Sequence, residues 1–262
     1  MRSTILLFLF ILAPNIQAKQ NNLTVVVFPD HDQHYAQSRF YQAGWSLFSE
    51  AAENANVKLE IRSEPWLRSI HLLKQERVDA VFGAVYLKER EIFAKYSLPV
   101  AMDSFYLYSA SPKSIDFTVD DYNQSYVGVA KGSVQEKIAN EMNFAGVYTP
   151  VIPQEIFTLL DHKRIDFAIF TESQKNVYCA KFKPELVNTN NCLHPIGDSL
   201  KRMPIFVIHQ YSPNVVNLIQ KINKQILLLI ESGRAKSIFT TAKYSDLEYL
   251  QWLKNVKLGH IN

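Results

Sequence analysis

Hydrophobic residues in the first part of the chain form two patterns, unbroken runs and stripes at helical spacing. Residues 23–28 and 78–85 are apolar runs of strand length, which suits strands buried on both faces, and residues 57–62 alternate like a half-buried strand. Apolar side chains at helical spacing predict one helix over residues 38–54 and another that begins at Pro65. Alternation of strands and helices is typical of α/β folds.

A polar stretch, residues 111–125, follows a further predicted strand at residues 102–109. We expect a boundary between two lobes there. After it the pattern starts again, and LLDHKRIDFAIF (159–170) resembles LLKQERVDAVF (72–82). Both segments join a helix to a buried strand through a basic turn.

The other elements of the second part follow from the same two patterns. We expect strands at 126–130, near Val147 and at 201–209, and helices at 132–142, at 213–230 and around Leu247, Leu250 and Trp252. The chain is therefore predicted to be an α/β protein of two lobes, each a mixed, mainly parallel sheet flanked by helices. Ligands in such folds bind outside the carboxyl ends of the strands.

The first 18 residues have the parts of a secretory signal peptide. Arg2 lies in the charged beginning, residues 5–12 are apolar, and Ala18 stands at the predicted cleavage point. The apolar part is too short to span a bilayer, and no cysteine at the cleavage point suggests a lipid anchor. We expect export to the periplasm.

Composition narrows the range of partners. The chain has 262 residues, 47% of them hydrophobic, with a formal net charge of +3 and no run of five or six like charges. Nothing predicts nucleic acid or an anionic membrane as a partner. The patterns GxSxG and HExxH and a phosphate-binding loop are absent, so we expect no cofactor and no metal. We also expect a monomer.

Cys179 and Cys192 are the only cysteines. In an oxidising compartment such a pair usually forms a disulfide, which we expect around a surface loop and which would contribute about 3 kcal/mol. Two free thiols are the alternative. A metal site is disfavoured because the sequence contains no CxxC.

Six segments, in this order and at this spacing, resemble the extracellular solute-binding proteins of family 3, the periplasmic amino-acid-binding type. They are LTVVVF (23–28), PWLRSIHLLKQERVDAVFG (65–83), LKEREIFAKYSLP (87–99), VGVAKGS (127–133), RIDFAIF (164–170) and NKQILLLIESGRAKSIFTTAKY (223–244). The PWLR segment also resembles a subgroup of these proteins without an obvious transporter specificity.

The resemblance implies the type II periplasmic binding fold. Residues 22–108 and 206–262 would form one lobe and residues 110–203 the other, with two hinge crossings between them. Solute would bind in the cleft and hinge closure would bury it.

Arg90 matches an arginine that clamps the carboxylate of the solute in this family and is followed seven residues later by a serine, here Ser97. A guanidinium group meets two carboxylate oxygens at once. The alternative is a solvated arginine paired with Glu89 or Glu91.

The sequence departs from the family just before this arginine. Val85, Tyr86 and Leu87 stand where the family usually has threonines that help to hold the carboxylate. A carboxylate other than that of an α-amino acid, or a larger acid, therefore becomes a candidate.

Further candidate ligand-binding residues follow from the resemblance. Trp66 matches an aromatic wall of the cleft, with a core position as the alternative, and Tyr35 matches a second wall. Arg68 follows two residues after Trp66, and a surface charge is its alternative. In the family, an acidic residue after the strand that corresponds to residues 164–170 binds the ammonium group of the solute. Thr171 and Glu172 stand at this place, although the spacing differs from the family pattern by one residue.

Two local motifs have competing interpretations. Lys131 and Ser133 lie where a predicted helix begins, and they would contact an anion or simply cap the helix. Residues 30–35, with His31 and His34, are interpreted as a solvated polar loop in preference to a zinc site, because a third protein ligand is not identified.

The leading hypothesis for function is a periplasmic solute-binding protein that captures a small carboxylate, an amino acid or a related organic acid, for an ABC-type importer. One alternative is a sensor module for a membrane kinase or cyclase. The other is an enzyme like the periplasmic dehydratases of cyclohexadienyl acids, with Glu172 as the general acid.

Overall fold

The structure is a computed structural model that describes residues 21–112, 122–150, 152, 154–189 and 192–259. The predicted signal peptide lies outside these residues. The strands are β1 (Asn22–Val27), β2 (Lys58–Ser63), β3 (Ala80–Val85), β4 (Lys95–Tyr96), β5 (Ala101–Ser109), β6 (Tyr126–Gly128), β7 (Gly146–Tyr148), β8 (Phe167–Thr171), β9 (His194–Pro195) and β10 (Lys201–His209).

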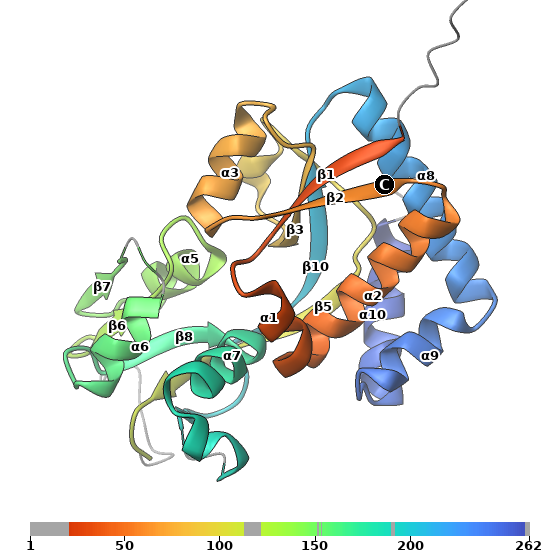
Figure 1. Cartoon of the computed structure of the whole chain (residues 1–262). Helices are drawn as coiled ribbons and strands as arrows, with labels where there is room; N and C mark the ends of the chain where they lie inside the picture. Colours follow the sequence, from red (N-terminus) through yellow and green to blue (C-terminus); the bar gives the residue numbers. More distant parts are fainter. Residues whose placement is uncertain (1–20, 113–121, 151, 153, 190–191, 260–262) are drawn as a thin grey trace, which may run out of the picture.

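Helices cover both faces of the sheet that these strands form (Figure 1). They are α1 (His31–Gln37), α2 (Arg39–Asn54), α3 (Trp66–Lys74), α5 (Val134–Glu141), α6 (Gln154–Asp161), α7 (Glu172–Phe182), α8 (Pro213–Glu231), α9 (Arg234–Thr241) and α10 (Asp246–Gly259), with 3-10 turns η1 (Lys88–Arg90) and η2 (Pro184–Thr189). None of the helices within the described ranges is long and apolar enough to cross a membrane.

One mixed sheet runs through the described residues in the order β2-β1-β3-β10-β5-β8-β6-β7, with β4 beside β10 and β9 beside β5. The outer pairs β1-β2, β1-β3, β6-β7 and β6-β8 are parallel. The central pairs β3-β10, β10-β5 and β5-β8 are antiparallel. The predicted α/β architecture with mixed sheet and flanking helices is confirmed.

Side chains of β1 alternate between two apolar clusters. Leu23, Val25 and Val27 pack with α2, α8, α9 and α10, whereas Val26 packs with α3 on the other face. Because successive side chains of a strand point to opposite faces, a strand covered on both sides becomes an unbroken apolar run. This is why LTVVVF predicts a strand correctly.

β8 at the other end of the sheet has the same arrangement. Ala168 and Phe170 pack against α6 and α7, and Phe167 and Ile169 pack against α5. The clusters around β1 and β8 contain different helices, so each end of the sheet has its own covering layers (Figure 1).

β5 and β10 are long antiparallel strands that link the two ends of the sheet. Residues 201–205 of β10 pair with β5, and residues 205–209 pair with β3. Residues 101–105 of β5 pair with β10, and residues 105–108 pair with β8. Each of these strands therefore belongs to both halves of the molecule.

The polar loop expected at residues 30–35 is wrong, because residues His31–Gln37 form α1. This helix has no buried residue, so it has no apolar stripe that would distinguish it from a loop. β2 also differs from expectation: it is an edge strand in which only Leu59 is partly buried.

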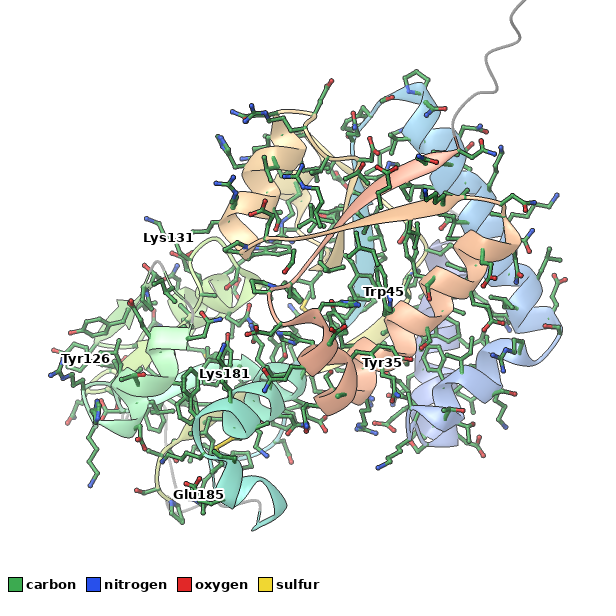
Figure 2. All side chains as sticks on the ribbon, in the orientation of Figure 1. Tyr35, Trp45, Tyr126, Lys131, Lys181 and Glu185 are labelled. Atoms are coloured by element: carbon green, nitrogen blue, oxygen red, sulfur yellow. A yellow bond between two sulfur atoms is a disulfide. The ribbon has the colours of Figure 1, made fainter. Side chains whose placement is uncertain are left out.

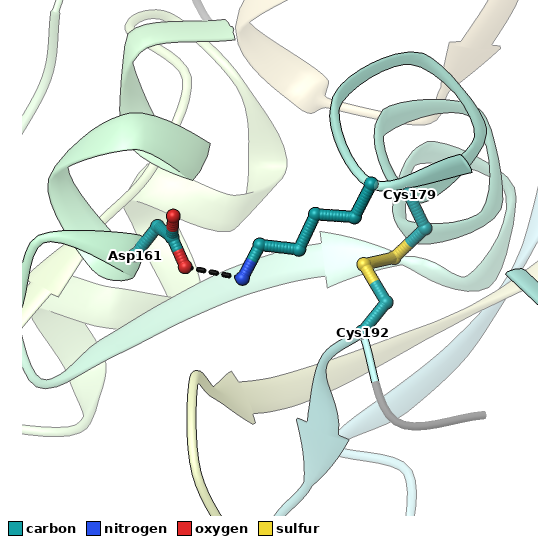
Figure 3. The surroundings of a disulfide bond; sticks show 4 residues. Asp161, Cys179 and Cys192 are labelled. Carbon is teal, nitrogen blue, oxygen red and sulfur yellow. Dashed lines mark hydrogen bonds and ion pairs between the residues drawn. A yellow bond between two sulfur atoms is a disulfide. The ribbon is translucent and has the colours of Figure 1, made fainter. Parts of the chain in front are cut away.

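The predicted disulfide is confirmed between Cys179 in α7 and Cys192, with a Cα–Cα distance of 5.9 Å (Figure 3). Both cysteines are buried in the apolar cluster around α6 and α7. The bridge ties the segment after α7 to the core, and Lys183 of this segment also forms an ion pair with Asp161 (Figure 3).

Candidate functional site

A cavity of about 320 Å³ lies between the two halves of the molecule and takes side chains from both. Its size is in the range of small-molecule sites. Most of its wall is apolar, and seven aromatic residues dominate it: Phe28, Phe40, Tyr41, Trp66, Phe82, Phe105 and Tyr178. The polar residues of the lining are few, which makes their positions informative.

Arg90 lines this cavity at the end of η1 and is only 5% exposed. Its Nη1 donates to the carbonyl oxygen of Val85 (2.8 Å), and its Nη2 donates to the carbonyl oxygen of Gly132 (3.3 Å). Gly132 belongs to the other half of the chain and has φ +68°, a conformation that favours glycine. Arg90 therefore joins the two sides of the cavity.

The charge of Arg90 has no anionic partner within the part of the chain that the structure describes. No Asp or Glu side chain there forms an ion pair with it. Glu89 pairs with Lys137, and Glu91 accepts a hydrogen bond from Tyr86. Burial lowers the pKa of Arg90. Its partners are neutral groups, the two carbonyl oxygens and the Tyr96 hydroxyl, and a buried cation with neutral partners is suited to binding an anion.

Trp66 begins α3 and packs its ring 4.9 Å from the guanidinium carbon of Arg90. The indole also contacts Phe28, at 5.9 Å between ring centroids. Its Nε1 is buried, and among the described residues it has no hydrogen-bond partner. A buried indole N–H without a partner among the described residues therefore belongs to the residue whose ring packs on the guanidinium group.

Ser97, the serine that the family pattern pairs with Arg90, has a structural position. Its hydroxyl donates to the carbonyl oxygen of Leu98 and accepts from the backbone N–H of Val207. It is buried and does not line the cavity. This serine joins the segment after η1 to β10.

The side of the cavity formed by α5 and α7 is polar. Ser133 lines it, but its hydroxyl caps α5 by accepting from the backbone N–H of Glu136. Thr171 caps α7 in the same way, and Gln174 completes the capping box. The amide of Gln135 donates to Gln174 (2.9 Å).

Asp103 of β5 is a cavity residue that sequence reasoning missed. It is 5% exposed, and its Oδ1 accepts from the backbone N–H of Ser104 (2.8 Å). Burial raises its pKa to about 7, while the hydroxyls of Ser173 and Thr171 hydrogen-bond to the carboxyl group. Its position in the sequence could have indicated this, because an acidic residue within the otherwise largely apolar strand MDSFYLYS is unusual.

Four predicted site residues lie outside the lining. Arg68 is exposed and pairs with Glu64, and Lys131 projects from the outer surface (Figure 2). Tyr35 points toward α2, where its hydroxyl contacts Ser46 (3.0 Å; Figure 2). Glu172 begins α7 and lies 3.6 Å from Arg39. The binding roles of all eight predicted residues stay predictions.

His34 of α1 lines the cavity, and burial lowers its pKa to about 4, so the ring is neutral near pH 7. It packs on Phe28 and Tyr41 at 5.5 and 5.3 Å. His31 hydrogen-bonds to Tyr41 instead (2.7 Å). Among the described residues there is no group of three or more His, Cys, Asp or Glu side chains that could hold a metal ion.

Polar contacts also cross between the halves beside α1. Ser38 Oγ donates to Ser173 Oγ (2.5 Å), and both residues are buried. Lys181 of α7 pairs with Asp30 before α1 (2.7 Å). These contacts and the Arg90–Gly132 bond hold the two sides of the cavity together.

No family profile matches the sequence, and neither does any curated protein. Solved structures do match. An amino acid ABC transporter substrate-binding protein, AbpA from Streptococcus pneumoniae bound to L-arginine, is 20% identical with a TM-score of 0.63, covering 85% of this chain and 94% of its own. A histidine kinase sensor domain with similarity to periplasmic binding proteins is 15% identical with a TM-score of 0.67, covering 84% and 95%.

The ancestral amino-acid-binding protein AncCDT-1, a precursor of cyclohexadienyl dehydratase, is 17% identical with a TM-score of 0.65, covering 85% of this chain and 96% of its own. At these identities the matches establish the fold. The chain has the type II fold of periplasmic solute-binding proteins.

Proposed function

We propose that the protein is a periplasmic solute-binding protein that captures a small carboxylate-bearing solute, an amino acid or a related organic acid. The observation that carries this proposal is Arg90, a buried guanidinium group on an aromatic cavity, without an ion-pair partner among the described residues. A solute carboxylate would neutralise it and accept from Trp66 Nε1. Hydrogen bonds to charged groups are worth about 1.5–3 kcal/mol.

The two lobes of the proposal are residues 22–108 with 206–262, and residues 110–203. The separate apolar clusters at the two ends of the sheet support this division. β5 and β10 would be the hinge crossings, because each strand pairs with both halves. A cavity with walls from both lobes is buried when the lobes close.

The body of the solute is proposed to be apolar. Val85 replaces a hydroxyl-bearing residue of the family pattern and lines the cavity with Phe82 and Phe105. Aromatic walls favour a hydrocarbon or aromatic body by burying its surface.

The proposed role is delivery of the solute to an ABC-type permease. The similarity to an ABC transporter substrate-binding protein supports it, and the similarity to a histidine kinase sensor domain supports a sensor partner as the alternative. Loss of uptake of the identified solute in a strain that lacks the protein would favour import.

A thermal-shift screen of the exported protein against amino acids, dicarboxylates, polyamines and aromatic acids tests the binding proposal. A solute at a thousandfold excess over its dissociation constant adds about 4 kcal/mol of stability. Arg90→Gln should abolish the shift. Arg62→Gln, on exposed β2, is the matched control and should keep it. An equal shift in both variants would refute the carboxylate clamp.

An enzyme is the second candidate, and Asp103 is the observation that favours it. General acids operate best with a pKa near the working pH, and burial raises that of Asp103 to about 7. Glu172, the acid expected from the sequence, pairs with Arg39 outside the lining. Product formation from cyclohexadienyl acids, lost in Asp103→Asn, would favour this candidate over simple binding.

A further inference from the structure

Asp103 is the second charged group whose partner the structure leaves open. Among the described residues, no Lys, Arg or His side chain forms an ion pair with it, and its contacts are the Ser104 backbone and the Ser173 and Thr171 hydroxyls. A buried carboxyl group retains accepting capacity beyond these neutral donors. A hydrogen-bond donor of a molecule bound in the cavity would pair with the remaining lone pairs of this carboxyl group.

Sheet register separates Asp103 from the position of Arg90. β10 lies between β3 and β5, with Val85 opposite Ile205 and Asp103 opposite Met203. Two interstrand spacings and two residues along a strand therefore lie between the backbones of Val85 and Asp103, on the order of 10 Å. Arg90 is hydrogen-bonded to the Val85 carbonyl group, so its guanidinium marks one end of this span.

An α-amino acid headgroup carries its carboxylate and amine on one carbon atom. These two groups are therefore much closer to each other than the two backbone positions that carry the anchors are. A solute that matches the spacing of these backbone positions carries its donor several bonds from its carboxylate. The aromatic residues Tyr41, Phe82 and Phe105 line the same cavity and suit the apolar body between the two polar ends.

We propose that Asp103 is a specificity-determining anchor that selects solutes carrying an amine, or a comparable cationic donor, several bonds from the carboxylate that Arg90 binds. This inference rests on the proposed function, because it assumes that Arg90 binds the acid end. It assigns the solute class as acids with a remote amine and an apolar body.

The ionisation of the groups around Asp103 adds a pH signature. Burial raises the pKa of Asp103 to about 7, so the carboxyl group acquires its charge between pH 6 and 8. Glu172 raises this pKa further by its negative charge. The pKa values of Tyr108 and Tyr244 are raised mainly by burial, and that of His34 is lowered to about 4, so these side chains stay neutral over this range.

The experiment uses matched acids that differ by a remote amine: hexanoate and 6-aminohexanoate, norleucine and lysine, and 3-phenylpropionate and its para-aminomethyl derivative. Their affinities for the exported protein are measured by calorimetry at pH 6 and pH 8. In at least one pair we expect the amine to bind about tenfold tighter or more at pH 8, as for a hydrogen bond to a charged group. The advantage should shrink at pH 6.

Two variants separate the possible failures. Asp103→Asn should remove the preference for the amine and keep the affinity for the parent acid, whereas Arg90→Gln should weaken both. If parent acids bind through Arg90 but the amine gives no advantage at either pH, the Asp103 assignment is wrong and the proposed function stands. If no member of the three pairs binds the wild type, both are overturned. The wild-type pH comparison remains decisive if Asp103→Asn does not fold.

Discussion

Replacing Trp66 by Phe tests whether the indole N–H beside Arg90 lacks a partner in the protein itself. The substitution removes the N–H donor and keeps an aromatic ring. Because Trp66 Nε1 is buried without a partner among the described residues, its removal relieves a cost of about 1–3 kcal/mol. The chain offers a matched control: Trp252 is fully buried, and its Nε1 donates to the Pro99 carbonyl oxygen (2.9 Å).

The expected free energies differ between the two positions. At Trp252, which is fully buried, the substitution leaves a void on the order of 40 Å³, which costs about 1 kcal/mol at about 24 cal/mol per Å³. Trp66 is partly buried and lines the cavity, so the corresponding cost there is at most of this size. At Trp66 this cost is offset by relief of the unpaired donor, so we expect a stability within about 1 kcal/mol of wild type, or above it. At Trp252 the Pro99 oxygen loses its donor, and the total loss should reach about 2–4 kcal/mol.

Urea unfolding of the wild type and the two variants measures these differences. Affinity for a carboxylate solute should fall in Trp66→Phe by about three- to tenfold, because a donor to the acid is removed. Equal destabilisation by the two substitutions would show that the N–H of Trp66 is already partnered. An unchanged affinity would remove Trp66 from the acid-binding end of the cavity.

Three other changes test separate features. Replacing Cys179 and Cys192 by Ala should lower the free energy of unfolding by about 3 kcal/mol, because the bridge closes a loop with a sequence separation of 13. Reductant should then lower the melting temperature of the wild type and leave that of the variant unchanged. Equal melting temperatures of the two proteins without reductant would contradict this. Gly83→Ala should lower the free energy of unfolding by about 1–3 kcal/mol and weaken solute binding, because Gly83 has φ +92° and a Cβ there would lie 2.8 Å from the Phe28 ring. A variant that melts at the same temperature as the wild type would disprove this strain. Asp103→Asn should gain stability relative to wild type as pH rises from 4 to 7. The folded pKa of about 7 exceeds the ordinary 3.8, so the folded wild type keeps its proton and loses stability across that window, while histidine effects are common to both proteins and cancel. A constant difference between the two unfolding curves at every pH would disprove the shift.

Most of the covered elements could be predicted from sequence because burial imposes a periodic pattern. The helix expected at 38–54 is Arg39–Asn54, and it buries Phe40, Leu47 and Phe48 on one face. α1 was missed because its polar residues are at most partly buried and form no apolar stripe. α7 was missed because its apolar residues do not form a stripe, although its capping box at Thr171 and Gln174 could have indicated its start.

The candidate site was only partly accessible to sequence reasoning. Arg90 and Trp66 stand in segments whose spacing matches a known family, and the structure places both on one cavity. Asp103 has no such context, because the residues around it in space come from β10 and α7, about 70 to 100 positions further along the chain. Only the folded structure shows that it shares a cavity with Arg90.

The late position of β10 in the sequence has a consequence for biogenesis. β3 and β5 have no central neighbour until residues 201–209 have been synthesised, because β10 inserts between them. A nascent chain that stops earlier exposes two unpaired strand edges and cannot complete its sheet. Cooperative folding therefore waits for the last quarter of translation, and contacts this distant in sequence form slowly.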